Sequence, residues 1–248
     1  MNTPRRGPDG LDPDQANLRA VPGYRAIVDY LHREIALGQL RPGDRLPPER
    51  RLAEQLGVAR ETLRQALRIL EGSGQIVVRR GAKGGAFVQE SILNPERIRE
   101  EARERADEIR HLAEFRTVIE AGAARLAAER RTEADLVRME QAQADLSSAE
   151  SVHDSRRADT DFHLAVAAAA GNPALASAIA DARVRMLSPI DLLSYRFEKH
   201  STCQAHAQVL HAIRDGDIEL AATAMTSHLA NTVREFELLV REVSTPTT

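Results

Sequence analysis

A carboxylate and several histidines in the second half of the sequence have the types and spacing of metal ligands. Asp159 and His163 are four residues apart, so on a helix their side chains leave the same face, one turn apart. Two ligands of a single cation need this arrangement. Six of the eight histidines lie between residues 153 and 228, and two of them, His206 and His228, fall on later predicted helices. Spacing alone slightly favours a second interpretation, in which these are ordinary core-edge histidines and Asp159 is a surface acid, because such pairs arise often by chance.

Residues 46–88 have the order of helices and strands expected of a DNA-binding domain, which we call the reader. Pro47 and Pro48 suit the first turn of a helix, which is predicted from Glu49 to Leu56. Gly57 can take the left-handed conformation of a sharp turn, after which a second helix is predicted over about residues 60–70. The face of this second helix opposite its apolar stripe carries side chains that can bond phosphates or base edges. These are Arg60, Glu61, Thr62, Arg64 and Arg68.

A β-hairpin is predicted directly after this helix. Residues 76–78 are a β-prone run, residues 79–85 form a basic, glycine-rich turn, and residues 86–88 return, which together read as a two-stranded wing. Arg80 and Lys83 lie near its tip. The charged face of the helix over residues 60–70 could alternatively be an ordinary solvent-exposed surface. The predicted wing provides a second element that could contact DNA, and it therefore favours the DNA-binding interpretation.

The net charge of −3 is unevenly divided along the chain. Residues 21–90 carry 12 Arg or Lys against 8 Asp or Glu, a balance of +4, and residues 91–248 carry 19 against 26, a balance of −7. Residues 1–20 carry three of each. The basic charge therefore lies around the predicted reader, where it would steer that part of the molecule toward DNA.

Length and composition indicate a globular protein with more than one domain. The 248 residues are 42% apolar and 29% charged, and they contain no apolar stretch of membrane-spanning length. Residues 1–20 are polar and lack the apolar core of a signal peptide, so we expect a disordered leader on a cytoplasmic protein without a membrane partner. The single cysteine, Cys203, excludes an internal disulfide.

The rest of the chain predicts a mainly α protein whose second part is entirely helical. A helix over residues 23–37 precedes the reader, which spans residues 21–90, and a charged linker follows over residues 91–106. Beyond it, an antiparallel bundle over residues 107–242 is expected to hold any ligand in its interior, followed by a flexible tail over residues 243–248. Pro189 should kink or divide the fourth helix of the bundle. The six predicted helices span residues 107–130, 133–149, 151–170, 173–194, 198–215 and 217–241.

The segment over residues 23–88 resembles the winged helix-turn-helix of the GntR superfamily of bacterial transcription regulators. The resemblance includes the lead-in RPGDRLPPER, the recognition helix LGVARETLRQAL and the wing RRGAKGGAFV. Two departures limit what it implies: Ala59 replaces the usual hydroxyl residue that caps the recognition helix, and Glu61 replaces a small hydroxyl residue. The resemblance implies DNA contacts from Arg50, Arg60, Thr62 and Arg64, with Arg80 and Gly81 at the wing.

Residues 107–241 resemble the FCD effector domain that defines the FadR subfamily of these regulators. The matching stretches are EFRTVIEAGAARLAAER, DTDFHLAVAAAAGNPAL, HAQVLHAIRDGD and AATAMTSHL. Many such domains bind a metal through an Asp, a His four residues later and two further His, and these map onto Asp159, His163, His206 and His228. Three imidazoles and one carboxylate suit Zn²⁺ first, and Ni²⁺, Mn²⁺ or Fe²⁺ as well.

A small organic acid is the effector that such a site implies. Its carboxylate would take an open coordination position on the metal, and a guanidinium would close the far side. Arg116 matches an arginine that often faces the pocket in related domains, although an ion pair with Glu120 one turn later is an equal alternative. Arg183, Arg185 and Tyr195 are weaker candidates.

The expected function is that of a transcriptional repressor that binds an inverted-repeat operator as a homodimer, with its DNA affinity controlled by the acid. Two alternatives keep the DNA reader but make the metal purely structural or make the protein a direct metal sensor. A third alternative, a metal-dependent enzyme, lacks a compelling general base. Asp161, the nearest acid in sequence, points about 200° away from Asp159 on the same helix.

Overall fold

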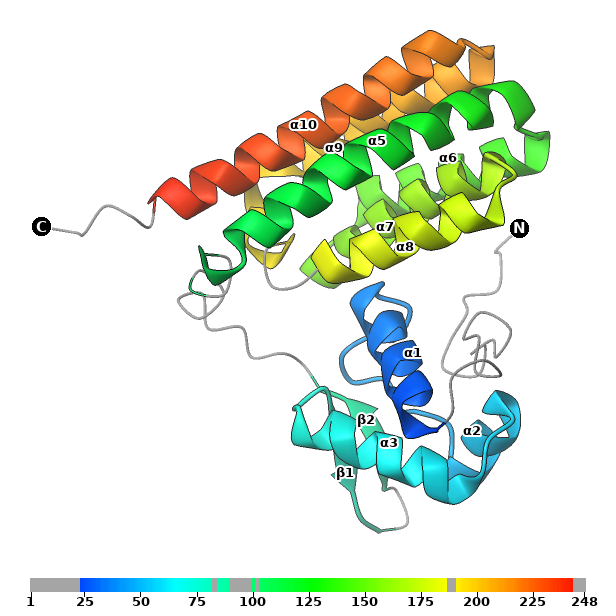
Figure 1. Cartoon of the computed structure of the whole chain (residues 1–248), viewed down its shortest axis with the longest axis vertical. Coiled ribbons are helices and arrows are strands. Elements are labelled where there is room, and N and C mark those ends of the chain that lie inside the picture. The colour runs from blue at the N-terminus through cyan, green and yellow to red at the C-terminus, as the bar shows by residue number, and fades with distance from the viewer. Residues whose placement is uncertain (1–22, 82–83, 90–99, 101–102, 187–190, 243–248) are drawn as a thin grey trace, which may run out of the picture. The chain divides into compact units, whose positions relative to one another are not determined.

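A computed structural model describes residues 23–81, 84–89, 100, 103–186 and 191–242 (Figure 1). The chain divides into two compact units at about residue 92. The predicted leader, the tail, Lys83 and most of the predicted linker lie outside the described residues. Within the described part, every helix is too short or too polar to cross a membrane.

The N-terminal unit is a winged helix-turn-helix, as predicted. Its two strands pair in an antiparallel hairpin in which Ile76 faces Val88. The second helix of the motif continues two residues beyond its predicted end at residue 70. The elements are α1 (Tyr24–Ala36), α2 (Glu49–Leu56), α3 (Arg60–Gly72), β1 (Ile76–Arg79) and β2 (Gly85–Val88).

The turn between α2 and α3 has the conformation that its residues predict. Gly57 ends α2 in the left-handed region with φ of 65°, which a side chain would strain. Ala53, buried in α2, leaves room for α3 to pack close to it. Ala59 occupies the N-cap position before α3 and makes no side-chain hydrogen bond to the helix, so the side-chain cap is lost as expected. Buried leucines on both helices, including Leu52 and Leu63, form the core that fixes the exposed face of α3.

The described residues of the C-terminal unit form helices and no strands, which confirms the predicted fold class. Two predicted boundaries are wrong: the helix placed over residues 173–194 ends at Met186, and the helix placed over residues 198–215 begins at Asp191. Pro189 lies between the two helices, outside the described residues, and a proline cannot donate the backbone bond that a helix interior requires. The helices are α5 (Ala106–Arg130), α6 (Glu133–Ser148), α7 (Val152–Ala169), α8 (Pro173–Met186), α9 (Asp191–Asp215) and α10 (Ile218–Glu242).

Side-chain caps fix where two of these helices begin, and small residues let the helices pack closely. The Thr132 hydroxyl accepts from the backbone of Asp135, and Ser151 caps α7 in the same way. Helices joined by short connections, such as α6 with α7 and α9 with α10, pack against each other, as in an antiparallel bundle (Figure 1). Their shared core is rich in alanine, which lets α5, α7, α9 and α10 approach closely enough for polar side chains to meet inside.

Candidate metal centre and nucleic-acid interface

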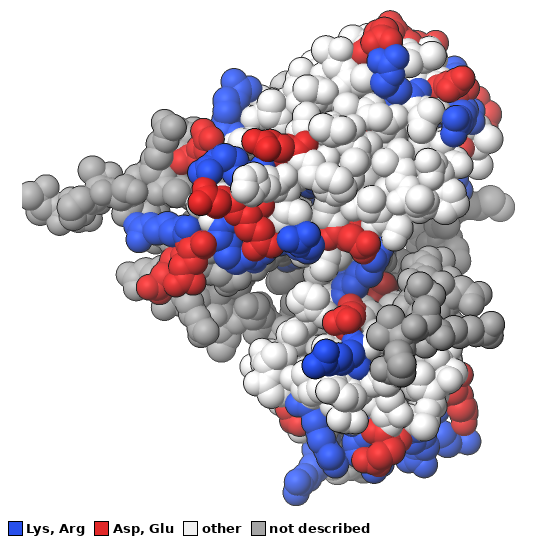
Figure 2. All heavy atoms as spheres, in the orientation of Figure 1, with Lys and Arg blue, Asp and Glu red and all other residues white. Residues whose placement is uncertain are grey.

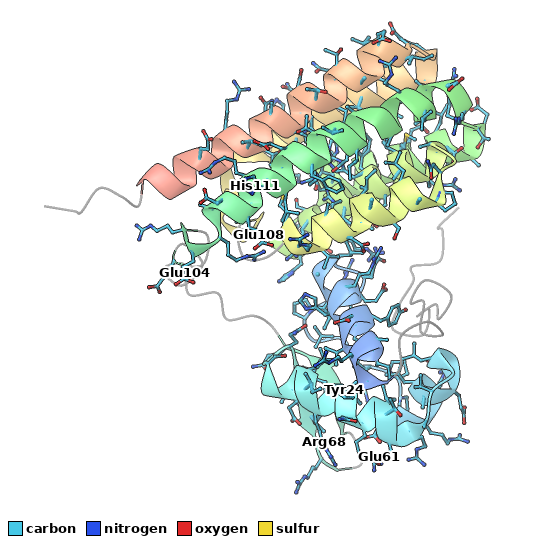
Figure 3. All side chains as sticks on the ribbon, in the orientation of Figure 1. Tyr24, Glu61, Arg68, Glu104, Glu108 and His111 are labelled. Atoms are coloured by element: carbon cyan, nitrogen blue, oxygen red, sulfur yellow. The ribbon has the colours of Figure 1, made fainter. Side chains whose placement is uncertain are left out.

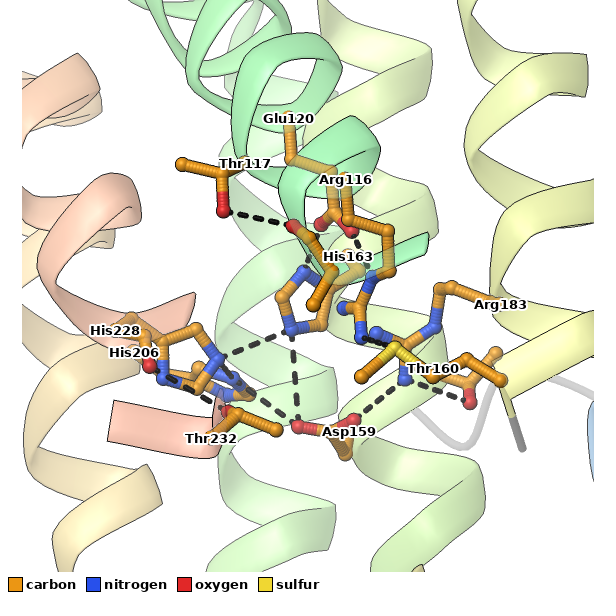
Figure 4. Close-up of polar contacts among 12 residues, drawn as sticks. Arg116, Thr117, Glu120, Asp159, Thr160, His163, Arg183, His206, His228 and Thr232 are labelled. Atoms are coloured by element: carbon orange, nitrogen blue, oxygen red, sulfur yellow. Dashed lines mark hydrogen bonds and ion pairs between the residues drawn. The ribbon is translucent and has the colours of Figure 1, made fainter. Parts of the chain in front are cut away.

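Four side chains from three helices converge inside the C-terminal unit (Figure 4). Asp159 and His163 extend from α7, His206 from α9 and His228 from α10. The Nε2 atom of His228 lies 3.2 Å from the Nε2 atoms of both His163 and His206. Asp159 Oδ1 lies 3.3 Å from His206 Nε2 and 3.8 Å from His163 Nε2. One potential ligand atom from each residue lies within 4.8 Å of all the others, so the structure brings together the four residues named from the sequence.

Burial and neighbouring charges hold Asp159, His163 and His228 in the protonation states of metal ligands. Burial lowers the pKa of His163 from 6.5 to about 4, although Glu120 acts in the opposite direction. Burial and the adjacent imidazoles also hold the pKa of His228 well below 6.5. The burial of Asp159 opposes ionisation, but the Arg183 guanidinium and the histidines outweigh it and lower the pKa of the carboxyl. At neutral pH, Asp159 is ionised while His163 and His228 are neutral, which are the forms that bind a cation.

The positions of the donor atoms fit one divalent metal ion. Metal–ligand bonds of about 2.1 Å at tetrahedral or octahedral angles separate neighbouring ligand atoms by about 2.9–3.4 Å, and three of the four contacts above lie within this range. His163 Nδ1 contacts Glu120 and must donate to it, so Nε2 presents a lone pair to the cluster. His206 Nδ1 is buried and has no hydrogen-bond partner among the described residues, which leaves Nε2 as the atom directed at its neighbours.

Arg183 is closer to this cluster than the sequence indicated. It is 1% exposed, and its Nη2 atom donates to Asp159 Oδ2 at 2.5 Å and to Thr160 Oγ1 at 3.1 Å. The second oxygen of Asp159 is therefore occupied by a guanidinium while the first faces the histidines. Arg185 instead lies at the surface with Glu108 at 3.0 Å, and the side chain of Tyr195 lies outside the described residues.

Arg116 forms the ion pair that was the alternative to its role as an effector ligand. Its Nε atom donates to Glu120 Oε1 at 2.6 Å, and Nη1 lies 3.3 Å from the sulfur of Met186. The other oxygen of Glu120 accepts from His163 Nδ1. The sequence predicted Glu120 only as a partner for Arg116. Its contact with His163 could not be predicted, because the helical spacing within α5 or α7 does not show how the two helices align.

The side chains proposed to read DNA lie on α2, α3 and the wing. Arg60 is exposed at the start of α3, and Thr62 is half-buried. Arg50 is exposed and lies 3.8 Å from Glu54. Arg80 and Gly81 are exposed beyond β1, where Gly81 has φ of 104°.

Acidic side chains interrupt the basic surface of α3. Arg64 Nη2 lies 3.1 Å from Glu49, and its Nη1 lies 3.2 Å from Glu61. Glu61 and Arg68 point away from α1 along the same helix (Figure 3). Basic and acidic side chains also alternate along the edge of the unit that α3 forms (Figure 2). A DNA phosphate approaching Arg64 would compete with two carboxylates, whereas Arg60 forms no such ion pair with any of the described residues.

Comparison with protein families gives two matches that together cover most of the chain. Residues 23–88 match the model described as bacterial regulatory proteins, gntR family, and residues 111–231 match the FCD domain. The chain is 32% identical to the HTH-type transcriptional regulator LutR of Bacillus subtilis over 78% of this chain and 92% of that protein. It is 33% identical to the Uxu operon transcriptional regulator of Escherichia coli over 84% of each chain.

A solved structure with a similar fold is that of Escherichia coli McbR/YncC. The two chains superpose with a TM-score of 0.53 at 23% sequence identity, over 90% of this chain and 99% of the other. At this identity the likeness concerns the fold, including the order of a winged helix-turn-helix followed by a helical domain.

Proposed function

This chain belongs to the GntR family of bacterial regulatory proteins, and from that premise we propose that a small organic acid controls its DNA binding through a metal site. The family and the named relatives make it a DNA-binding transcriptional regulator rather than an enzyme. The observation that carries the proposal is the convergence of Asp159, His163, His206 and His228 within the domain that accompanies the DNA reader. The match to the FCD domain supports the further proposal that the protein belongs to the FadR subfamily.

The proposed metal is a divalent transition ion, Zn²⁺ first. Four protein ligands leave coordination positions free when the ion is five- or six-coordinate, and a carboxylate is a suitable occupant because the ion supplies a positive charge in a buried site. Arg183 is a second candidate to meet that acid, because its guanidinium bonds one oxygen of Asp159 while the other oxygen faces the histidines. When bound, the ion would supply positive charge and a coordination position for the acid's carboxylate. The surrounding side chains would orient the acid.

At the DNA end, the proposal assigns contacts to the residues that face away from the core of the reader. A repressor that binds an inverted-repeat operator as a homodimer would place two copies of α3 in successive major grooves. Binding of the acid would change the relative placement of the two readers if it prefers one arrangement of the dimer. The assigned residues are Arg50, Arg60, Thr62, Arg64, Arg80 and Gly81.

An uncharged face on the helical unit supports the dimer. Phe115 is 46% exposed and Val118 is 73% exposed, and at three-residue spacing they share one side of α5. Figure 2 shows a broad area without charged side chains over α5 and α10. Exposed apolar side chains of this size favour contact with a second surface, and in the proposal that surface is the same face of a second copy.

Replacing Val118 with glutamate is therefore expected to shift the protein from dimer to monomer and to weaken binding to a two-half-site operator. A carboxylate at the centre of an isologous contact would face its own copy across the two-fold axis, and both would be desolvated. Sedimentation equilibrium and gel-shift titration measure the two effects. Val137, exposed on α6, offers the matched control Val137→Glu, which should leave the dimer intact; an unchanged dimer in Val118→Glu would place the interface elsewhere.

The proposed control is tested on metal-loaded full-length protein with an operator recovered by sequencing the genomic fragments that it retains. Operator affinity is measured with Zn²⁺ alone, with a chelator, and with Zn²⁺ plus each acid of a panel, and calorimetry follows acid binding directly. An acid that binds only the metal-loaded form and changes operator affinity supports the proposal. Affinity that depends on free metal without any acid indicates a direct metal sensor, and affinity indifferent to both indicates a structural metal.

A further inference from the structure

Glu120 connects one of the candidate metal ligands to a buried arginine on its own helix. Its Oε2 atom accepts from His163 Nδ1, and its Oε1 atom accepts from Arg116 Nε at 2.6 Å (Figure 4). The Glu120 residue is 1% exposed, and its two partners are buried with it. A carboxylate so far from water is stable only when both of its oxygens have good donors, and here each oxygen has a different one.

The contact with Glu120 determines which nitrogen of His163 faces the cluster. An ionised carboxylate only accepts hydrogen bonds, so the Nδ1 atom that contacts it must carry the proton of the neutral ring. Nε2 then presents its lone pair toward Asp159 and His228, at 3.8 Å and 3.2 Å. In metal sites generally, a carboxylate behind a histidine fixes the ring's tautomer and orientation in this way and makes the ring a stronger donor.

The same contacts occupy the polar end of Arg116. Its Nε atom bonds Glu120, and its Nη1 atom contacts the sulfur of Met186 on α8. To hold an acid directly, this guanidinium would have to leave a carboxylate that is buried beside it. Its position behind Glu120 instead lets it fix the carboxylate against His163.

We propose that Glu120 is a positioning residue that orients His163 for metal binding, and that Arg116 acts on the site through Glu120 instead of contacting the effector acid. This inference rests on the metal site proposed above. It assigns the two residues a role in metal affinity that neither their exposure nor their helical spacing predicts. The Arg116–Glu120–His163 chain also joins α5 to α7, so the fit of these two helices and the strength of metal binding depend on the same contacts.

Measurements of metal affinity distinguish a positioning role of Glu120 and Arg116 from a purely electrostatic effect of their charges. Zn²⁺ or Co²⁺ binding is measured by competition with a chromophoric chelator in Glu120→Ala, Glu120→Gln and Arg116→Met. Glu120→Ala should weaken binding by about 10–100-fold, and Glu120→Gln should weaken it less because the amide oxygen can still accept from Nδ1. Removing the positive charge of Arg116 would by electrostatics alone tighten cation binding, so weaker binding in Arg116→Met is the result expected from lost positioning. Tighter or unchanged binding would overturn the role of Arg116.

A matched control lies on the same helix. Arg125 pairs with Glu219 at 2.6 Å on the surface, away from the cluster, so Arg125→Met removes an arginine of α5 without touching His163. Its metal affinity should equal that of the wild type. Thermal melts of each protein in chelator identify variants that fail to fold, and the conservative Arg116→Lys should restore part of the lost affinity if the variant Arg116→Met is folded but weak.

A readout without metal tests the positioning role itself. The ¹⁵N chemical shifts of the His163 ring, recorded on metal-free full-length protein, distinguish a proton on Nδ1 from one on Nε2. The expected result is a proton on Nδ1 in the wild type and a mixture of both forms in Glu120→Ala. A wild-type ring protonated on Nε2 would overturn the inference even if metal binds. A ring protonated on Nδ1 in a protein that binds no metal would uphold the contact, while the proposed metal function would fail.

Discussion

Replacing His206 with alanine is expected to lower Zn²⁺ affinity by at least about 100-fold and to abolish any response of DNA binding to organic acids. His206 Nε2 lies 3.2 Å from His228 Nε2 and 3.3 Å from Asp159 Oδ1, so the substitution removes one of the four proposed ligands. Loss of a residue that merely supports a ligand costs about 10–100-fold, and loss of the ligand itself should cost more. Chelator competition measures the affinity, and operator titration with the acid measures the response.

Stability provides a second measurement of the same prediction. Metal that binds only the folded protein should raise the free energy of unfolding by about 2.7 kcal/mol at a free concentration of 100 times Kd. The wild type should show this gain, and His206→Ala should not at the same metal concentration. The His206 ring also stacks on Phe162 with centroids 4.0 Å apart, so the variant will lose packing energy even in chelator. The metal-dependent difference, not the absolute stability, therefore carries the test.

His211 gives the matched control for this substitution. It lies on the same helix, its side chain is exposed, and its Nδ1 atom is 3.8 Å from Asp215. The variant His211→Ala should keep the metal affinity and the metal-dependent stability of the wild type. If His206→Ala also kept them, the four residues would be a buried polar cluster without a metal, and the proposed control of DNA binding would lose its basis.

The sequence was sufficient for contacts that a single helix or turn determines. Gly57 is left-handed and Ala59 leaves α3 without a side-chain cap because these properties depend on neighbours in the chain. Asp159 and His163 share a face for the same reason. Helical spacing also places Glu120 one turn after Arg116, and their ion pair is present in the structure.

Contacts between helices required the structure because they depend on register and rotation. Helical spacing could not show that His206 and His228 meet Asp159, and only the resemblance to a family joined them. It also could not show that Glu120 reaches His163 across α5 and α7 or that Arg183 reaches Asp159 from α8. The first contact defines the tautomer of the His163 ring, and the second neutralises one oxygen of Asp159, both at the proposed metal site.

Arg60→Ala is expected to weaken operator binding by about 1–3 kcal/mol, or roughly 5–150-fold, and Arg64→Ala is expected to weaken it less. Arg60 is exposed at the start of α3, the part of a recognition helix that enters the major groove. Arg64 already lies 3.1 Å from Glu49 and 3.2 Å from Glu61, so any DNA contact it makes replaces existing ion pairs and yields a smaller net gain. Fluorescence anisotropy with the recovered operator measures both variants across a range of salt concentrations.

The salt dependence and a nonspecific duplex then distinguish the two kinds of contact that Arg60 can make. If its guanidinium binds a phosphate, affinity should fall equally for operator and nonspecific DNA, and the slope of log K against log salt should decrease by about 1. If it binds a guanine edge, the loss should be confined to the operator with little change of slope. Arg125→Ala, which alters an exposed arginine of the helical unit, should change neither affinity nor slope. Wild-type affinity in Arg60→Ala on the operator would exclude a contact from Arg60, and wild-type affinity in both Arg60→Ala and Arg64→Ala would contradict the assignment of α3 as the reading element.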